Sequence, residues 1–534
     1  MADSPWWHGA VLYQLYVRSW RDSNGDGYGD LRGIIERLDH LSWLGVDGIW
    51  LSPTMPSPDQ DWGYDVSDYT GVHPELGNLD DLDALVAAAA VRGIRVLLDL
   101  VPNHTSSAHP WFVDAASSRD AEHRDYYVWA DRAPGGGPPN NWLDATGQSA
   151  WQWDAATSQY YLHNFLPGQP DLNWWLPSVH AEFRDILRFW FDRGIAGFRI
   201  DVAHGLYKDA DLRDNPALPP GSSKMEGRFG LRPVYNANRP DTHSVYRDWR
   251  KIAEGYSPAK LLLGETWVGD LSRLASYYGD DDELQLAFNF PAAFADFSMP
   301  GLADVVTQTL AALPPGACPV WTASNHDIGR FPTRWCARDD ARTRLALLVL
   351  STLPGTVVLY YGDEIGMTDV DVPAGLQRDV MTLGGQNPQG NRDRARTPMR
   401  WDSSPSGRFT GDGVRPWLPI GPAAVNVADQ RAGTGSTLWL TRRLLTLRRT
   451  ELAGQIPHLE VLAAPPDQWV YRVGQLVVAA NFSGRPARLP AAAGEVLLTS
   501  SGPDWKDRGP DNAALGPWEG VVARTPDRLL PALA

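Results

Sequence analysis

The stretch IRVLLDLVPNH, residues 94–104, carries the pattern on which the fold prediction depends. A short apolar run of strand-forming residues ends directly in polar residues that can cap a loop or line a site. Similar apolar runs recur along the chain, and stretches with the helical spacing i, i+3, i+4, i+7 separate them. This alternation of strand and helix predicts a parallel sheet covered by helices.

Eight such strands are expected. They are residues 11–18, 46–52, 94–100, 196–202, 261–264, 284–289, 319–324 and 356–361. One intervening helix runs through residues 31–41, with Asp30 as its N-cap and Gly45 beyond its end. Another runs through residues 183–191 and ends before Gly194. Eight strand–helix units predict an α/β fold in which the sheet closes into a (β/α)8 TIM barrel.

Two interruptions of this alternation predict additional domains. After Val101 the chain becomes rich in Trp, Gly and Pro, which predicts an inserted domain after strand 3. The last ~80 residues show the alternation of a C-terminal antiparallel β-sandwich. The expected domains are the catalytic barrel at 1–103 and 176–452, the inserted domain at 104–175, and the sandwich at 453–534. A long loop at 203–242 follows strand 4, and in a barrel it would rise from the catalytic face.

Composition excludes several classes of protein. The 534 residues include 48 Lys and Arg against 64 Asp and Glu, and the resulting net charge of −16 argues against nucleic acid as a partner. No apolar run reaches the ~18 residues of a membrane span. The start MADSPWWH has no secretion signal, and two cysteines make no disulfide framework, so we expect a cytoplasmic protein. The 24 Trp residues suit sugar binding or simple core packing.

Polar residues gather where several predicted strands end. Asp99, Asp201, Glu265 and Asp327 follow or end four different strands, and in a barrel these ends meet on one face. Paired carboxylates suit cleavage of a glycosidic bond, because one protonates the leaving oxygen while the other attacks the sugar. Arg199, two residues before Asp201, is expected to keep it ionised. Glu265, which Thr266 and Trp267 follow, is expected to sit against an apolar ring that raises its pKa for general-acid work.

Four segments identify a family by resemblance. DLVPNHTS (99–106), GFRID (197–201), GETW (264–267) and SNHD (324–327) resemble the four signature regions of the α-amylase superfamily, glycoside hydrolase family 13. QPDLN (169–173) resembles an extra motif of its oligo-1,6-glucosidase group. The resemblance covers nearly the whole chain. It implies that Asp201 is the nucleophile, Glu265 the general acid/base, and Asp327 a third carboxylate that holds sugar hydroxyls.

The resemblance also implies a substrate-binding set. His104, Arg199 and His326 would complete the subsite of the reacting glucose, and Phe165 would form a pocket wall, with ordinary core packing as its alternative role. DWGYD (61–65) resembles a motif in which Asp61 binds the terminal glucose and Tyr64 stacks on it. Arg392, in RDRARTP (392–398), would bridge to Asp61. This bridge would close the non-reducing end and favour exo action.

The segment DSNGDGYGD (22–30) spaces oxygen ligands at alternate positions, as a hard cation requires. Gly33 occupies the twelfth position, so the segment is not an EF-hand. It resembles the metal loop of related α-glucosidases. The residues that would hold a structural Ca²⁺ or Mg²⁺ are Asp22, Asn24, Asp26, Asp30 and, through its carbonyl, Tyr28. An Asx-rich turn without metal is the alternative.

Together these features predict a retaining, exo-acting α-glucosidase that releases α-glucose from short α-glucosides. Maltose and malto-oligosaccharides are favoured because the loop at 203–242 is unlike that of oligo-1,6-glucosidases, although Val202 after the nucleophile fits α-1,6 preference. Alternatives are an oligo-1,6-glucosidase, a transglucosylase, or a sucrose- or trehalose-directed member. A non-catalytic relative is disfavoured by the complete set of three carboxylates. The expected partner is a small-molecule α-glucoside, with neither nucleic acid nor membrane, and the oligomeric state is not predicted.

Overall fold

The computed structural model describes residues 4–222, 225–227, 229–380, 391–490, 493–502 and 514–525. Within these residues, eight parallel strands form the central sheet in the order β10-β11-β1-β2-β3-β7-β8-β9. The strands are β1 (Val11–Leu15), β2 (Gly48–Leu51), β3 (Arg95–Leu100), β7 (Gly197–Ile200), β8 (Leu261–Gly264), β9 (Leu286–Ala287), β10 (Val320–Thr322) and β11 (Thr356–Tyr360). The predicted TIM barrel is therefore confirmed.

The strands lie where the apolar runs predict them, and several are shorter. β8 has the predicted bounds, whereas β1 ends at Leu15 because the 3-10 helix η1 (Val17–Ser19) follows. β9 keeps only two of the six expected residues. β1 pairs with both β2 and β11, so the first and last strands lie side by side. This pairing brings the two ends of the barrel sequence together.

The seam of the barrel lies between β9 and β10, and a side chain bridges it. The hydroxyl of Tyr278 accepts a hydrogen bond from the backbone N–H of Ala287 in β9 (3.3 Å). The same hydroxyl donates to the carbonyl of Cys318, two residues before β10 (2.9 Å). Tyr278 therefore joins the two strands that end the sheet order.

Helices surround the sheet. They include α1 (Leu31–Leu44), α2 (Leu79–Val91), α4 (Pro177–Asp192), α5 (Thr242–Glu254), α6 (Leu271–Ser276), α8 (Met299–Ala312), α10 (Asp340–Thr352) and α13 (Thr437–Glu451). Asp30 caps α1 by accepting from Gly33 N–H (2.7 Å), and Gly45 ends it with φ of 99°, as the sequence predicts. On α4 the predicted apolar stripe, including Phe183 and Trp190, is buried.

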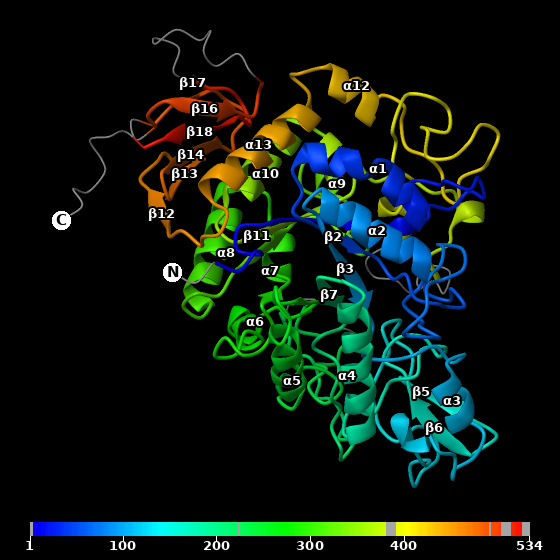
Figure 1. Cartoon of the computed structure of the whole chain (residues 1–534). Helices are drawn as coiled ribbons and strands as arrows, with labels where there is room; N and C mark the ends of the chain where they lie inside the picture. Colours follow the sequence, from blue (N-terminus) through cyan, green and yellow to red (C-terminus); the bar gives the residue numbers. More distant parts are fainter. Residues whose placement is uncertain are drawn as a thin grey trace.

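A separate small unit lies between β3 and α4. It contains α3 (Pro110–Ala115) and an antiparallel sheet of β4 (Trp129–Ala130), β6 (Gln159–Leu162) and β5 (Trp151–Asp154). Its own apolar cluster includes Trp142 and Leu162. Figure 1 shows this unit at the end of the molecule opposite the C-terminal sheet. The inserted domain thus extends from the C-terminal end of strand 3.

The C-terminal region is an antiparallel β structure. β12 (Leu459–Leu462), β13 (Gln468–Val473), β14 (Leu476–Asn481), β18 (Gly520–Arg524) and β16 (Val496–Thr499) form one sheet in that order. β15 (Ala487–Arg488) pairs with β17 (Ala514–Leu515), and the side chain of Leu515 packs into the cluster on one sheet face. The opposite face meets the barrel, where Tyr471 hydrogen-bonds Thr352 of α10. The residue boundaries of the three domains remain predictions.

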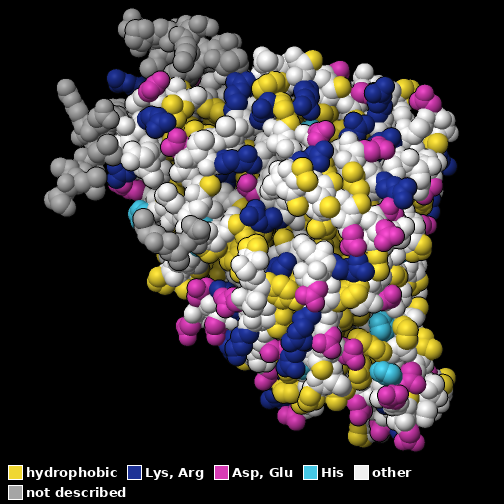
Figure 2. All heavy atoms as spheres, in the orientation of Figure 1, with side chains coloured by type: hydrophobic (Ala, Val, Ile, Leu, Met, Phe, Trp, Pro, Cys, Tyr) yellow, Lys and Arg dark blue, Asp and Glu magenta, His cyan; other side chains and the backbone are white. Residues whose placement is uncertain are grey.

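Charged side chains of both signs are mixed over the face shown in Figure 2. None of the helices in the described ranges has the length and apolar character needed to cross a bilayer.

Candidate active site

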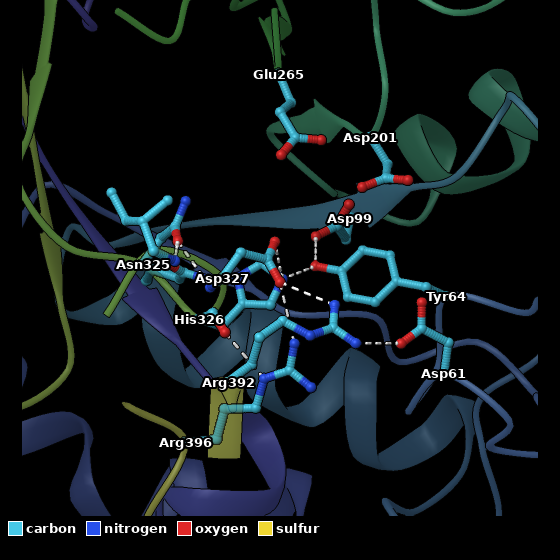
Figure 3. A network of polar contacts seen from close by, with 12 residues as sticks. Asp61, Tyr64, Asp99, Asp201, Glu265, Asn325, His326, Asp327, Arg392 and Arg396 are labelled. Carbon is cyan, nitrogen blue, oxygen red and sulfur yellow. Dashed lines mark hydrogen bonds and ion pairs between the residues drawn. The ribbon is translucent and has the colours of Figure 1, made fainter. Parts of the chain in front are cut away.

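The polar ends of the barrel strands meet at one cavity of about 530 Å³. The backbone N–H of Asp201 donates to Leu100 O, and that of Glu265 donates to Ile200 O, each at 2.8 Å. Each acidic residue therefore continues the backbone hydrogen bonding of the sheet by one position and lies at the rim of the barrel. Figure 3 shows the carboxyl groups of Asp201 and Glu265 pointing toward the space above Asp327.

One buried guanidinium group holds three of the carboxylates together. Arg199 Nη1 lies 2.7 Å from Asp201 and 2.9 Å from Asp99, and its Nη2 lies 2.9 Å from Glu265. Glu265 also accepts a hydrogen bond from the N–H of Val202 (3.0 Å). Asp201 and Glu265 are consequently fixed on either side of the same cation.

The protonation of this group differs from the sequence prediction. Arg199 contacts Asp201 as expected and lowers the pKa of its carboxyl, but burial raises this pKa more strongly, and the charges of Glu265 and Asp99 add to the increase. Burial also raises the pKa of Asp99 to about 6, against the attraction of Arg199. Three carboxylates around one cation disfavour full ionisation, so the cluster retains a proton more readily than isolated side chains do.

The Glu265 carboxyl is held by two polar contacts. It pairs with the guanidinium of Arg199 and accepts a hydrogen bond from the backbone N–H of Val202. The ring of Trp267 packs against Phe290, with ring centroids 4.5 Å apart. The apolar ring expected against the Glu265 carboxyl stays a prediction.

Asp327 is held in its ionised form. Arg392 Nη1 lies 3.1 Å and Arg396 Nη2 lies 3.0 Å from its Oδ1. Burial by itself raises the pKa of Asp327, but His326 and the two guanidinium groups outweigh it and hold the pKa well below its usual value. Asp327 can therefore accept hydrogen bonds from a ligand throughout the neutral range.

The side chains of His326 and Tyr64 lie beside Asp327 in the site. Burial lowers the pKa of His326 to about 3, so its ring is neutral. The amide of Gln14 donates to Nδ1 (2.8 Å), which leaves the proton on Nε2, and Nε2 lies 3.2 Å from Asp327. The ring of Tyr64 stacks on that of His326 at 5.3 Å, and its hydroxyl donates to Asp99. Both predicted residues therefore belong to the site.

The inner end of the cavity is closed by the predicted bridge. Arg392 Nη2 lies 2.8 Å from Asp61 Oδ1. The same nitrogen and Nε also contact Asp379, a carboxylate that the sequence prediction did not include. Arg392 thus connects Asp61, Asp379 and Asp327, and its planar group is fixed by all three.

His104 and Phe165 line one side of this inner end. His104 Nε2 lies 2.9 Å from the carbonyl of Tyr64, and burial lowers the pKa of His104. The Phe165 ring lies 5.2 Å from the His104 ring and lines the cavity, which favours the predicted wall over the core. Gln169 also lines the cavity and contacts His104 (3.3 Å) and Asp61 (3.4 Å).

Four residues of the site were given no role by the sequence: Asp99, which was expected only on the face where the strand ends meet, and Gln169, Asp379 and Arg396. Asp99, Gln169 and Arg396 lie within motifs that were quoted for their neighbours, so the motifs were the available signal. Asp379 lies between motifs, and no local pattern indicates its role.

The predicted metal loop is stabilised by its own hydrogen bonds. Asp22 accepts from the N–H groups of Gly25 and Gly27, Asp26 accepts from Tyr28 N–H, and Asp30 caps α1. A carboxylate has about four acceptor positions, so oxygen lone pairs remain, and an all-oxygen donor set fits a hard cation. In the described residues, however, ligand atoms of Asp22, Asp26 and Asp30 do not all lie within 4.8 Å of one another, so the cation stays a prediction.

A second acidic group is neutralised by arginine. Ligand atoms of Asp59, His73 and Glu75 lie within 4.8 Å of one another. Arg18 contacts both carboxylates of this group and lies 2.8 Å from Asp59. An ion pair with arginine therefore accounts for their convergence.

The parallel barrel brings Asp201 and Glu265 to one guanidinium with Asp327 nearby, and paired carboxylates of this kind are what a glycoside hydrolase requires. Residues 14–454 match the family model "Alpha amylase, catalytic domain", and residues 457–522 match a "Domain of unknown function (DUF3459)". The chain belongs to the α-amylase family.

Similar proteins agree with this assignment. A "Probable alpha-glucosidase" of Rhizobium meliloti (strain 1021) is 41% identical over 86% of this chain and 86% of its own length. An "Oligo-1,6-glucosidase" of Heyndrickxia coagulans is 36% identical over 90% of this chain and 92% of its own. The crystal structure of an "alpha-glucosyl transfer enzyme, XgtA" superposes with a TM-score of 0.89 at 36% identity, covering 98% of this chain and all of that one.

Proposed function

We propose that this protein is a retaining, exo-acting α-glucosidase that releases α-glucose from the non-reducing end of short α-glucosides. The observation that carries the proposal is the Asp61–Arg392 bridge, 2.8 Å long, at the inner end of the cavity that contains Asp201 and Glu265. A closed end admits one terminal sugar and stops a longer chain from passing through. This geometry supports exo action.

The proposed roles of the carboxylates are those that the family resemblance implies. Asp201 attacks the anomeric carbon as the glycosidic C–O bond breaks, and Glu265 gives its proton to the leaving oxygen. Water then attacks the glucosyl ester, passes a proton to Glu265, and releases α-glucose and the Asp201 carboxylate. The retaining arrangement is supported by the shared guanidinium of Arg199, which keeps the two carboxylates close. Asp327 and His326 would hold sugar hydroxyls.

Maltose remains the favoured substrate over isomaltose. The loop at 203–242 contributes much of the cavity lining, including Asn236 and Phe229. This loop would contact the leaving sugar, and its sequence is unlike that expected of an α-1,6-specific enzyme. The second candidate function is glucosyl transfer, which is favoured by the similarity to the α-glucosyl transfer enzyme.

The test measures initial rates of glucose release from maltose and isomaltose as kcat/KM, with proton NMR of the first product. We expect α-glucose to appear first and maltose to be favoured by at least about tenfold, a difference of about 1.4 kcal/mol. The Glu265→Gln variant should lose about 1,000-fold of the maltose rate. β-Glucose as first product, or an active Glu265→Gln variant, would contradict the proposal.

We also propose a structural divalent cation, Ca²⁺ or Mg²⁺, at the loop of Asp22, Asn24, Asp26, Tyr28 and Asp30. The oxygen-only donor set supports it. Chelator should lower the melting temperature, and added Ca²⁺ or Mg²⁺ should restore it. Asp26→Asn should remove this response, whereas Asp211→Asn, in an exposed acidic position of another loop, should keep it. A melting temperature that chelator does not change would contradict the cation site and favour an Asx-rich turn without metal.

A further inference from the structure

One short loop between β2 and α2 carries two of the side chains at the inner end of the cavity. Residues 57–65 include Asp61, which pairs with Arg392 at 2.8 Å, and Tyr64, whose ring stacks on that of His326 (Figure 3). A change in the shape of this loop would therefore displace both contacts together.

Asp61 and Tyr64 are the two ends of a tight turn. The carbonyl of Asp61 accepts a hydrogen bond from the backbone N–H of Tyr64 (3.1 Å). The two central residues, Trp62 and Gly63, have positive φ angles of 52° and 100°. This is the pattern of a type I′ turn, which suits Gly and Asn and is unfavourable for a bulky residue such as Trp. The turn is strained at Trp62, so contacts outside the turn must hold it.

Arg18 holds the outer side of this loop. Its guanidinium lies 2.8 Å from the carboxylate of Asp59, another residue with positive φ (59°). The ring of Trp62 lies against the same guanidinium, with 5.4 Å between the ring centroid and the central carbon of the guanidinium. These contacts fix the side of the loop that is turned away from the cavity.

The carboxylate of Asp65 holds the inner side of the loop. Its Oδ1 accepts hydrogen bonds from the hydroxyl of Ser57 (2.7 Å) and from the backbone N–H of Asp61 (3.0 Å). Its Oδ2 accepts from the backbone N–H of Gln60 (3.0 Å). Asp65 therefore joins the beginning of the loop to its end, and one of its three donors is the backbone of Asp61 itself.

Asp65 is a buried acid that the cleavage of the glycosidic bond does not use. Burial raises the pKa of its carboxyl to about 6, against the effect of its hydrogen bonds, so the group is mainly ionised above neutral pH. A buried carboxylate is costly unless hydrogen bonds satisfy it, and here all three printed donors belong to one loop. Asp65 is not among the described residues that line the cavity.

We propose that Asp65 is a positioning residue for substrate binding, because its carboxylate fixes the strained turn in the shape that brings Asp61 to Arg392 and to the terminal glucose. The inference rests on the proposed function, since it concerns how the inner end of the same site is built. Asp65 acts through Asp61 and touches no substrate atom. Loss of its carboxylate should therefore weaken binding of the terminal sugar more than it slows cleavage of the bond.

The Asp65→Asn variant tests this role through the split between KM and kcat. Asparagine has nearly the same shape, but its amide nitrogen would oppose one of the N–H groups that the carboxylate accepts. We expect KM for maltose to rise about 30-fold and kcat to change by less than about threefold. A KM within about threefold of the wild-type value, or a fall in kcat that exceeds the rise in KM, would overturn the proposal.

Asp68→Asn is the matched control for this variant. Asp68 lies three residues further along the chain, is exposed, and accepts from the N–H of Thr70 (2.8 Å) within its own turn. Its substitution should leave KM for maltose within about twofold of the wild-type value, because it makes no printed contact with residues 57–65. A rise in KM equal to that of Asp65→Asn would contradict a specific role for Asp65.

A double-mutant cycle tests whether Asp65 acts through Asp61. Asp65→Asn is introduced into the Asp61→Ala variant, which already lacks the side chain that the loop positions. We expect the further fall in kcat/KM for maltose to be less than about fivefold, because the two changes remove the same interaction with the sugar. A larger further fall would show that Asp65 supports the site independently of Asp61, and would overturn the proposal.

Ser57→Ala keeps the proposal testable if the melting temperature shows that Asp65→Asn does not fold. This variant removes one donor to Asp65, so KM for maltose should rise about fivefold while kcat stays the same. An unchanged KM in this variant would contradict the proposal. If the wild-type enzyme released no glucose from maltose, the proposed function would fail. An active wild-type enzyme whose KM did not respond to these variants would overturn this inference alone.

Discussion

The inner end and the outer half of one cavity are built from opposite uses of polar groups. At the inner end, Arg199 and Arg392 pair with several carboxylates while Asp201, Glu265 and Asp327 still face the cavity. In the outer half, Asn164, Asn215 and Asn236 hydrogen-bond mainly to one another and to buried backbone. Carboxylates thus face the ligand at the inner end, whereas the three asparagine amides of the outer half are engaged with one another.

This difference shows how one pocket separates chemistry from selectivity. Buried carboxylates paired with arginine keep charge where a glycosidic bond must be broken, at a large desolvation cost that the pairing offsets. Self-satisfied amides fix a shape without adding charge. Changes at the inner end should therefore alter the rate strongly, whereas changes to the buried polar contacts behind the asparagine amides should act mainly on stability.

The largest effect is expected from Asp201→Asn. The amide cannot attack the anomeric carbon, so kcat on maltose should fall by at least about 10,000-fold. The melting temperature should not fall, because the substitution removes a negative charge from a buried cluster of three carboxylates. A loss below about tenfold, measured by initial rates, would show that the inner end does not carry the chemistry.

A smaller effect is expected from Arg392→Lys, which tests the closed end. Lysine keeps the charge but cannot contact Asp61, Asp327 and Asp379 together, so kcat/KM for maltose should fall by about 100-fold. Arg394→Lys is the matched control, because Arg394 lies in the same motif, is 44% exposed, and contacts Asp371 outside the cavity. Equal losses of kcat/KM in both variants would show that the Asp61–Arg392 bridge has no special role.

Lys208→Met should act on stability at the junction of the barrel and the inserted domain. Lys208 Nζ lies 2.7 Å from Asp171 and 2.8 Å from Asn103, and all three side chains are buried. Removing the cation leaves Asp171 unpaired at the junction of barrel and inserted domain, at a cost of roughly 3 kcal/mol in the free energy of unfolding. Denaturant unfolding measures this, with the exposed Lys251→Met as control. Unchanged stability would show that the junction does not depend on this pair.

The smallest effect is a pH shift in Asp99→Asn. Catalysis requires ionised Asp201, whose pKa is raised by burial and by the charges of Glu265 and Asp99, so the acid limb of kcat/KM should lie above the ordinary range of aspartate. Loss of the Asp99 charge makes Asp201 easier to ionise, and the limb should move to lower pH. A pH–rate profile on maltose checks this direction. A shift to higher pH would contradict the electrostatic coupling.

Much of the fold was predictable because it depends on local patterns. The apolar runs ending at Leu100, Ile200 and Gly264 locate three barrel strands, and two of the carboxylates that we propose as catalytic, Asp201 and Glu265, directly follow such runs. Parallel strands bring their carboxyl ends to one face of the barrel, and this does not depend on the conformation of the loops. For this reason Asp201, Glu265 and Asp327 could be assigned to one site before any coordinates.

Contacts between distant segments were not predictable. Asp379 reaches Arg392, Tyr278 joins the two seam strands, and Phe229 crosses the cavity mouth to the inserted domain. None of these residues lies in a recurring motif, because each position is set by how long loops pack. The pKa of Asp201 was also misjudged, since the sequence indicates the neighbouring arginine but not the depth of burial.

The sequence by itself therefore determined the barrel, the order of its strands and the residues at its catalytic rim, since strand periodicity and motif spacing are local properties of the chain. Only the tertiary structure decided how many carboxylates share Arg199, which groups close the inner end, and what faces the leaving group. The physical reason is that electrostatic and packing energies depend on distances between side chains far apart in the sequence, and the folded loops alone fix those distances.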